Sequence, residues 1–241
     1  ERVKQGAYQT DSTRGTIAIY QPIANLSAAK SAYGNIVYNK APAFLRQAEF
    51  YLGEDKFKTA VRAFLKKHEF GNAGWEDLVR EFETASGKEL NKWADTWIKR
   101  PGLPTIRTTY RALKTDPKVE APVSGSDFPP ITGWVDTSQG WFFGSSQWGM
   151  NWNTYLIFRN GPAETRLAES DSKAVSSNLS IPVYGTLVAA LPNYGDYGYG
   201  IFLLDDKIRD YVLKNIRREK DPFLRSMMWG ALWDSIREGE L

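Results

Sequence analysis

Apolar side chains recur with a helical period through the first hundred residues. They return every three or four positions, so each stretch places one continuous apolar stripe along a helix. Gly87 and the pair Pro101-Gly102 follow two of these stretches, and such residues typically end helices. Pro42 is favourable in a first turn and begins another stretch. The pattern predicts four consecutive helices with short connections, over residues 42–53, 57–68, 75–87 and 90–98.

The middle of the chain has a different pattern. Its apolar segments are short, rich in β-branched and aromatic residues, and separated by turn-forming residues. Asn160-Gly161-Pro162 lies between two such segments and indicates a hairpin. We expect a small antiparallel β-sandwich of about 100 residues. Its predicted strands cover residues 105–111, 153–159, 164–168, 186–191 and 198–204.

Helical periodicity returns after Asp205. Asp221-Pro222 supplies an N-cap and a first-turn proline for the last helix. Apolar residues cover most of the circumference of this helix, so it requires burial on more than one side. Because no residue follows Leu241 here to bury it, we expect this chain to be cut from a longer protein.

The charged residues divide the chain in the same way. Residues 1–120 contain 34 of the 59 charged side chains, residues 121–204 contain 9, and residues 205–241 contain 16. The sequence therefore predicts an α+β fold in three parts, with a helical front, a β-rich middle and a helical tail.

Composition excludes several classes of function. A net charge of +3 is too small to indicate a nucleic-acid or membrane-surface partner. No apolar run approaches the roughly 18 residues of a membrane span. The absence of cysteine removes disulfides, thiolate metal sites and cysteine nucleophiles. His68 is the only histidine, whereas histidine–zinc hydrolases need at least two imidazoles.

Short motifs follow one another in order along the chain. They are Tyr38-Asn39-Lys40-Ala41, Leu52-Gly53-Glu54-Asp55, Ala63-Phe64-Leu65-x-x-His68, Ala85-Ser86-Gly87, Trp93-x-x-x-Trp97, Gly102-Leu103-Pro104, Leu191-Pro192-Asn193 and Gly198-Tyr199-Gly200. In order and spacing they resemble zinc aminopeptidases of the membrane alanyl aminopeptidase type, which are gluzincins. The resemblance covers nearly the whole chain and is strongest over residues 30–104.

This resemblance implies a domain assignment. Residues 1–104 would be the C-terminal helical part of a thermolysin-like catalytic domain. Residues 105–205 would form the β-sandwich domain, and residues 206–241 would begin a C-terminal helical domain. The chain would then contact further domains on both sides.

The resemblance also implies a zinc cofactor in the intact parent. In that family a His-Glu-x-x-His segment and a later Glu hold the metal, and a Gly-x-Met-Glu-Asn segment binds the substrate amine. Neither segment occurs in this sequence. By the order of the family they would precede Glu1. We therefore expect this chain to bind no zinc and to be inactive alone, while the parent removes N-terminal residues from peptide substrates by a zinc-activated water.

Tyr38 is the candidate catalytic residue. By resemblance, its hydroxyl stabilises the negatively charged oxygen of the tetrahedral intermediate. The competing interpretation is a half-buried tyrosine at a helix start, with its hydroxyl hydrogen-bonded inside the fold. Ala41 stands where the family usually has glycine, and alanine is unsuitable there only if the backbone needs a positive φ.

Other polar residues receive structural interpretations. His68 lies on an apolar stripe and is expected to be packed and hydrogen-bonded. The adjacent pairs Glu54/Asp55 and Glu76/Asp77 suggest acid–base chemistry, but each lies near a predicted helix start, where negative charge is favourable. We expect them to stabilise helix starts.

Two other functions remain open. A non-catalytic binding module could use an aromatic ligand platform in the sandwich, although the same rings could pack its core. The second open function is that of a naturally zinc-free relative of the family with only an interaction role. The platform residues would be Trp134, Trp141, Phe142, Phe143, Trp148, Trp152 and Tyr155.

Overall fold

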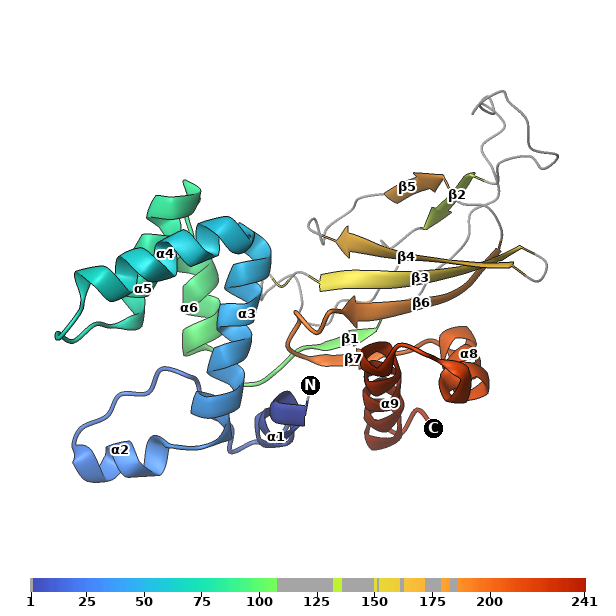
Figure 1. The fold of residues 1–241 in the computed structure, drawn as a ribbon. Coiled ribbons are helices and arrows are strands. Elements are labelled where there is room, and N and C mark those ends of the chain that lie inside the picture. The colour runs from blue at the N-terminus through green and yellow to red at the C-terminus, as the bar shows by residue number, and fades with distance from the viewer. Residues whose placement is uncertain are drawn as a thin grey trace. The chain divides into compact units, whose positions relative to one another are not determined.

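A computed structural model describes most of the chain as two compact units. The described residues are 2–107, 132–135, 150, 152–160, 163–171, 179–182 and 186–241. In the described chain, residues 2–104, Met150 and residues 197–200 form the first unit, and the remaining residues form the second. Figure 1 shows that the described residues are rich in helices and contain small sheets of few strands.

The first unit is helical. Its elements are α1 (Arg2–Asp11), α2 (Leu26–Ala32), η1 (Ile36–Lys40), α3 (Ala41–Leu52), α4 (Glu54–Lys67), α5 (Trp75–Ser86) and α6 (Asn91–Lys99). All four helices predicted in this region are present as α3 to α6. Gly53 and Gly87 follow α3 and α5 with φ of 84° and 71°, which glycine adopts without steric cost.

The apolar stripes of these helices form the core of the first unit. Val79 and Phe82 of α5 and Ala94 and Trp97 of α6 have no exposed surface. The ring of Phe57 on α4 stacks on that of Phe82 with 5.5 Å between centroids. The periodicity therefore predicted the helices and the buried faces of α5 and α6, whereas Leu45 and Leu65, on the predicted apolar stripes of α3 and α4, are 38% and 61% exposed.

The second unit contains the described strands. They are β1 (Thr105–Arg107), β2 (Thr132–Val135), β3 (Trp152–Asn160), β4 (Ala163–Asp171), β5 (Leu179–Pro182), β6 (Thr186–Tyr194) and β7 (Ile201–Leu203). β3 and β4 pair antiparallel from Asn160↔Ala163 onward, which confirms the predicted hairpin. β6 pairs antiparallel with the other edge of β3, and β2 pairs antiparallel with β5. A complete β-sandwich and the three-domain division stay predictions.

The expectation of purely antiparallel strands is wrong for one pair. β1 and β7 run parallel, with Ile106 opposite Phe202. The strand predicted over residues 198–204 also begins later, at Ile201. Its first residues join the first unit, where the side chains of Lys4 and Gln47 bond the carbonyl oxygens of Gly198 and Tyr197. These two carbonyl oxygens therefore accept hydrogen bonds from side chains, whereas in a longer strand they would accept them from the backbone of a neighbouring strand.

Two helices cover the sheet of the second unit. α8 (Asp206–Asn215) and α9 (Pro222–Arg237), with the short 3₁₀ turn η2 (Ile216–Arg218) between them, pack on β6 and β7. Figure 1 shows both helices on the same side of the three-stranded sheet. The shared core contains Ile157, Ala189, Ala190, Leu191, Leu204, Ile208, Tyr211, Val212, Ile216, Leu224, Met228 and Leu232.

α9 buries one face in the described structure. Leu224, Met228 and Leu232 are buried, whereas Trp229 and Trp233 are more than half exposed. The expected burial on a second side is therefore not present among the described residues. No helix in the described ranges is both long and apolar enough to cross a membrane.

Candidate functional site

Tyr38 lies on the π-helical turn η1, directly before α3. The N–H of Ala41 bonds the carbonyl oxygen of Ile36, five residues earlier, which is the spacing of a π-helix. Such turns are rare and frequently occur at functional sites. Ala41 has φ −60° and ψ −42°, an ordinary right-handed conformation, so alanine in place of the usual glycine causes no strain.

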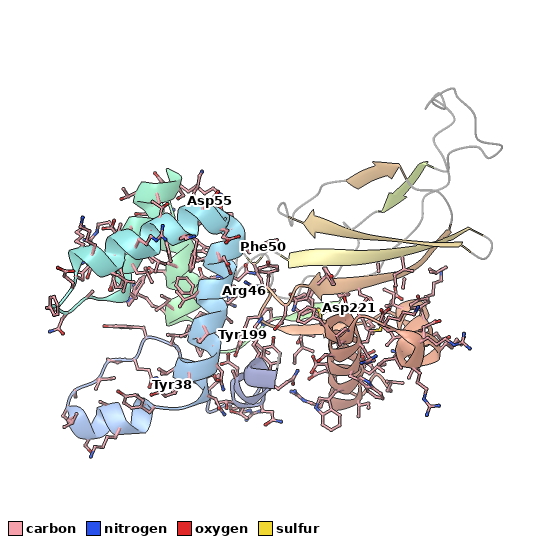
Figure 2. The ribbon with its side chains drawn as sticks, viewed as in Figure 1. Tyr38, Arg46, Phe50, Asp55, Tyr199 and Asp221 are labelled. Carbon is pink, nitrogen blue, oxygen red and sulfur yellow. The ribbon has the colours of Figure 1, made fainter. Side chains whose placement is uncertain are left out.

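The side chain of Tyr38 extends away from the core of the first unit. It is 60% exposed, and its ring centroid lies 5.9 Å from that of Tyr33. Its hydroxyl has no hydrogen-bond partner among the residues that the structure describes. This geometry differs from a half-buried tyrosine with a satisfied hydroxyl. Figure 2 shows Tyr38 at the beginning of the long helical segment that continues into α3.

A hollow of about 410 Å³ lies next to this turn. Its volume falls in the range of about 300–1,000 Å³ that is usual for small-molecule sites. Val37, which precedes Tyr38, and Tyr33, which contacts its ring, both line it. The complete lining is Ile19, Tyr20, Gln21, Ile23, Ala29, Ala32, Tyr33 and Val37. The exposed hydroxyl of Tyr38 therefore belongs to a turn that borders a mainly apolar hollow.

The opposite side of η1 contains a buried ion pair. The Nζ atom of Lys40 lies 2.8 Å from Oδ2 of Asp11, and neither side chain has exposed surface. Nζ also donates to the carbonyl oxygens of Gly102 at 2.7 Å and Arg100 at 3.2 Å. Burial lowers the pKa of Lys40, and the hydrogen bond and charge of Asp11 oppose that shift.

Tyr199 joins the same cluster from a distant part of the sequence. Its hydroxyl donates to Oδ2 of Asp11 at 2.8 Å. Burial, followed by the negative charge of Asp11, raises the pKa of Tyr199 far above its usual value of 10.0. The ring packs edge-on against Tyr8 with 4.9 Å between centroids. Figure 2 labels Tyr199 beside the N-terminal helices of the first unit.

A second set of contacts holds η1 against α1. The side chain of Asn35 donates to Oγ1 of Thr10, and that of Asn39 donates to Oδ1 of Asn35, both at 3.1 Å. Gly6 allows this close approach, because a Cβ there would lie 3.3 Å from Oδ1 of Asn35. The turn that presents Tyr38 is therefore fixed on two sides.

The other candidate residues lie away from this cluster. Glu54 and Asp55 occupy the first turn of α4, and Glu76 and Asp77 the first turn of α5, as expected for helix starts. The Gly74 N–H donates to Asp77 at 2.9 Å and lowers the pKa of that carboxyl group, with a smaller contribution from Arg80.

His68 ends α4 as its C-cap residue. Its ring packs 5.2 Å from that of Phe64, which confirms a packed position. The Nε2 atom is buried and has no hydrogen-bond partner among the described residues, so the expected hydrogen bond is not found at this atom.

The proposed aromatic platform cannot be placed. Trp134, Trp152 and Tyr155 fall on strands whose side chains are outside the description, and the other four rings lie outside the described residues.

The residues that the structure describes do not fit a zinc ion. Within the described ranges, no three residues among His, Cys, Asp and Glu come together in a way that could hold a metal. The sequence itself contains a single histidine.

Sequence reasoning missed the cluster of Asp11, Lys40 and Tyr199. Lys40 and Tyr199 both occur in the motifs that carry the resemblance, and this was the available signal. Asp11 had none, because it lies 91 residues from Gly102 and 188 from Tyr199 in the sequence. The predicted helices also began at residue 42 and left out α1, α2 and η1.

Comparison with known proteins links the first unit to one family. Residues 2–97 match the Peptidase family M1 domain. Aminopeptidase N of Streptomyces lividans is 24% identical over 252 residues, covering 100% of this chain and 28% of that protein. Tricorn protease-interacting factor F2 of Thermoplasma volcanium is 32% identical over 102 residues, covering 42% of this chain and 13% of that protein. Aminopeptidase 2 of Candida albicans is 33% identical over 103 residues, covering 43% of this chain and 11% of that protein. The matched part of this chain thus spans between 11% and 28% of the length of these relatives.

Proposed function

We propose that this chain, whose residues 2–97 match the Peptidase family M1 domain, is part of a zinc-dependent aminopeptidase of that family and contributes Tyr38 to it. The observation that carries the proposal is the placement of Tyr38. An exposed hydroxyl without a partner among the described residues is presented by a π-helical turn, inside the region that matches the family.

Amide hydrolysis is accelerated by such a donor. When a nucleophile adds to the scissile carbonyl, the carbon becomes tetrahedral and its oxygen gains negative charge. A pre-positioned O–H that donates to this oxygen stabilises the transition state more than the substrate, and losing one such donor typically costs about 2.7–4 kcal/mol. A tyrosine holds its hydroxyl at the end of a rigid ring with two side-chain torsions. The proton remains on Tyr38 and is shared with the substrate oxygen.

Zinc enters this proposal only as the cofactor of the complete protein. The described residues do not fit it, so we assign its binding to the His-Glu-x-x-His segment of the family, which does not occur in this sequence. The role of this chain is then to carry the tyrosine and the scaffold that holds it.

The substitution Tyr38→Phe in the complete protein tests the proposal. We expect kcat on an aminoacyl chromogenic amide to fall by about 10²–10³-fold, with KM and zinc content nearly unchanged, because the missing donor acts in the transition state. Tyr33→Phe is the matched control, since Tyr33 is equally exposed and contacts the ring of Tyr38. Turnover of Tyr38→Phe equal to that of the control would remove Tyr38 from the mechanism.

A further inference from the structure

Lys40 and Tyr38 lie two residues apart on η1 and occupy opposite environments. Tyr38 is 60% exposed, and Lys40 has no exposed surface. Burying an ammonium group is costly unless oxygen atoms replace its water. Three oxygen atoms do so here, one on the Asp11 carboxylate and two on the carbonyl groups of Arg100 and Gly102.

The carboxylate of Asp11 is the centre of this arrangement. Its Oδ2 atom accepts from Lys40 and from the hydroxyl of Tyr199. Its Oδ1 atom accepts from the Gly102 N–H at 3.0 Å and from the hydroxyl of Thr16. Donors from four separate segments therefore fix one carboxylate, and Lys40 connects the end of η1 to it.

The π-helical conformation of η1 affects the direction of the side chains that precede Lys40. A π-helical turn contains one more residue than an α-helical turn, and each residue of an α-helix rotates the side-chain direction by about 100°. If η1 relaxed into a continuous α-helix with α3, the residues before Lys40 would change direction by about that angle. An unfavourable local conformation of this kind persists only where contacts with the surrounding structure hold it in place. Ile36 and Lys40, four residues apart, form the buried side of the turn and leave Tyr38 outside.

We propose that Lys40, through its buried pair with Asp11, is a positioning residue that keeps η1 in its π-helical form and so sets the direction of the Tyr38 hydroxyl. The inference rests on the proposed role of Tyr38. Lys40 does not touch the substrate in this proposal, because it is enclosed on the other side of the turn.

A double-mutant cycle between Lys40 and Tyr38 tests the inference in the complete protein. We expect Lys40→Met to lower kcat by about 10²-fold, the scale of a 1 Å misplacement, with KM little changed. In the Tyr38→Phe background, where the hydroxyl is already absent, we expect Lys40→Met to cause less than about twofold further loss. Lys99→Met is the matched control, since Lys99 also pairs with an aspartate at 2.8 Å but is half exposed.

The outcomes separate the two proposals. Normal turnover of Tyr38→Phe overturns the proposed function, whatever Lys40→Met does. A loss in Tyr38→Phe together with the same loss from Lys40→Met in both backgrounds overturns the positioning role, because a general structural defect is independent of the hydroxyl. Turnover of Lys40→Met equal to that of Lys99→Met also overturns it.

A milder variant and a measurement without catalysis complete the test. Tyr199→Phe removes one donor to Asp11 and retains the ion pair, so we expect a smaller loss in kcat that also disappears in the Tyr38→Phe background. The amide of Tyr38, which bonds the carbonyl oxygen of Gly34 at 3.0 Å, should exchange its hydrogen faster in Lys40→Met, while the amides of α5 exchange as in the wild type. If Lys40→Met does not fold, Tyr199→Phe decides. Unchanged exchange at Tyr38 and additive losses in kcat would contradict the proposal.

Discussion

At the scale of single residues, the first unit combines an enclosed charge with an exposed hydroxyl. Removing one partner of a buried ion pair usually costs about 3–5 kcal/mol, because the remaining charge stays buried without compensation. The pair of Asp11 and Lys40 is therefore costly to break. Its hydrogen bonds reach the carbonyl groups after α6 and the hydroxyl of Tyr199, so breaking it affects several segments.

Tyr199 gives the folded state a dependence on alkaline pH. Its pKa is raised in the folded chain, first by burial and then by the charge of Asp11, whereas in the unfolded chain it ionises near 10.0. Above pH 10 the unfolded chain therefore binds fewer protons than the folded one, and this residue lowers the free energy of unfolding by up to about 1.4 kcal/mol per pH unit. Tyr199→Phe removes this contribution.

We expect the stability advantage of the wild type over Tyr199→Phe to shrink between pH 10 and 11 in urea unfolding. It should be constant between pH 7 and 9. The lowered pKa of Lys40 acts in the opposite direction below 10.5, but Lys40 is present in both proteins and its contribution largely cancels. Parallel pH profiles of the two proteins up to pH 11 would show that Tyr199 ionises normally in the folded chain.

At the scale of elements, helix starts in this chain use the residues that their local chemistry favours. Asp205 caps α8, and Asp221 caps α9 ahead of Pro222. The Oδ1 atom of Asp221 accepts from the N–H groups of Phe223 at 2.8 Å and Leu224 at 3.2 Å. These local contacts explain why the positions of the helices could be predicted from the sequence.

Asp221→Ala should lower the free energy of unfolding by about 1 kcal/mol, since two N–H groups at the start of α9 lose their acceptor. The midpoint of urea unfolding, followed by tryptophan fluorescence, measures this change. Asp210→Ala on α8 is the control, because Asp210 is exposed and lies 3.9 Å from Lys214. Equal midpoints for the two variants would show that the cap contributes nothing.

At the scale of the whole molecule, the chain holds a candidate catalytic side chain, and its described part contains no group of His, Cys, Asp and Glu residues that could hold a metal. The only histidine, His68, is packed against Phe64 at the end of α4. Because peptidase family M1 is zinc-dependent in general, the proposed role of Tyr38 also requires a zinc site. The proposed activity therefore belongs to the complete protein.

We expect the purified chain alone to release no product from aminoacyl chromogenic amides and to contain no stoichiometric zinc. A single histidine cannot form the usual pair of imidazole ligands. We would compare the purified chain with the complete protein at equal molar concentration. Mass spectrometry measures the zinc content of each, and a turnover assay measures the activity of each. Turnover by the pure chain that a chelator abolishes would contradict both the prediction and the assignment of zinc to other residues.

Two kinds of information were present in the sequence. The helical period placed α3 to α6, and turn and cap residues placed the β3–β4 hairpin and the start of α9, because these depend on neighbours within a few positions. The motif around Tyr38 identified the candidate residue by resemblance, and the family match over residues 2–97 supports the same family.

The tertiary structure alone decided how the candidate residue is held. The parallel pairing of β1 with β7 joins segments 96 residues apart, from Thr105 to Ile201. The contacts of Asp11 with Gly102 and Tyr199 join residues that are 91 and 188 positions apart. The pattern of apolar residues along the sequence does not predict such contacts, because they depend on which faces meet after the helices pack. The sequence determined that Tyr38 stands before a helix, and packing determined that Lys40 is buried behind it and that the hydroxyl is exposed.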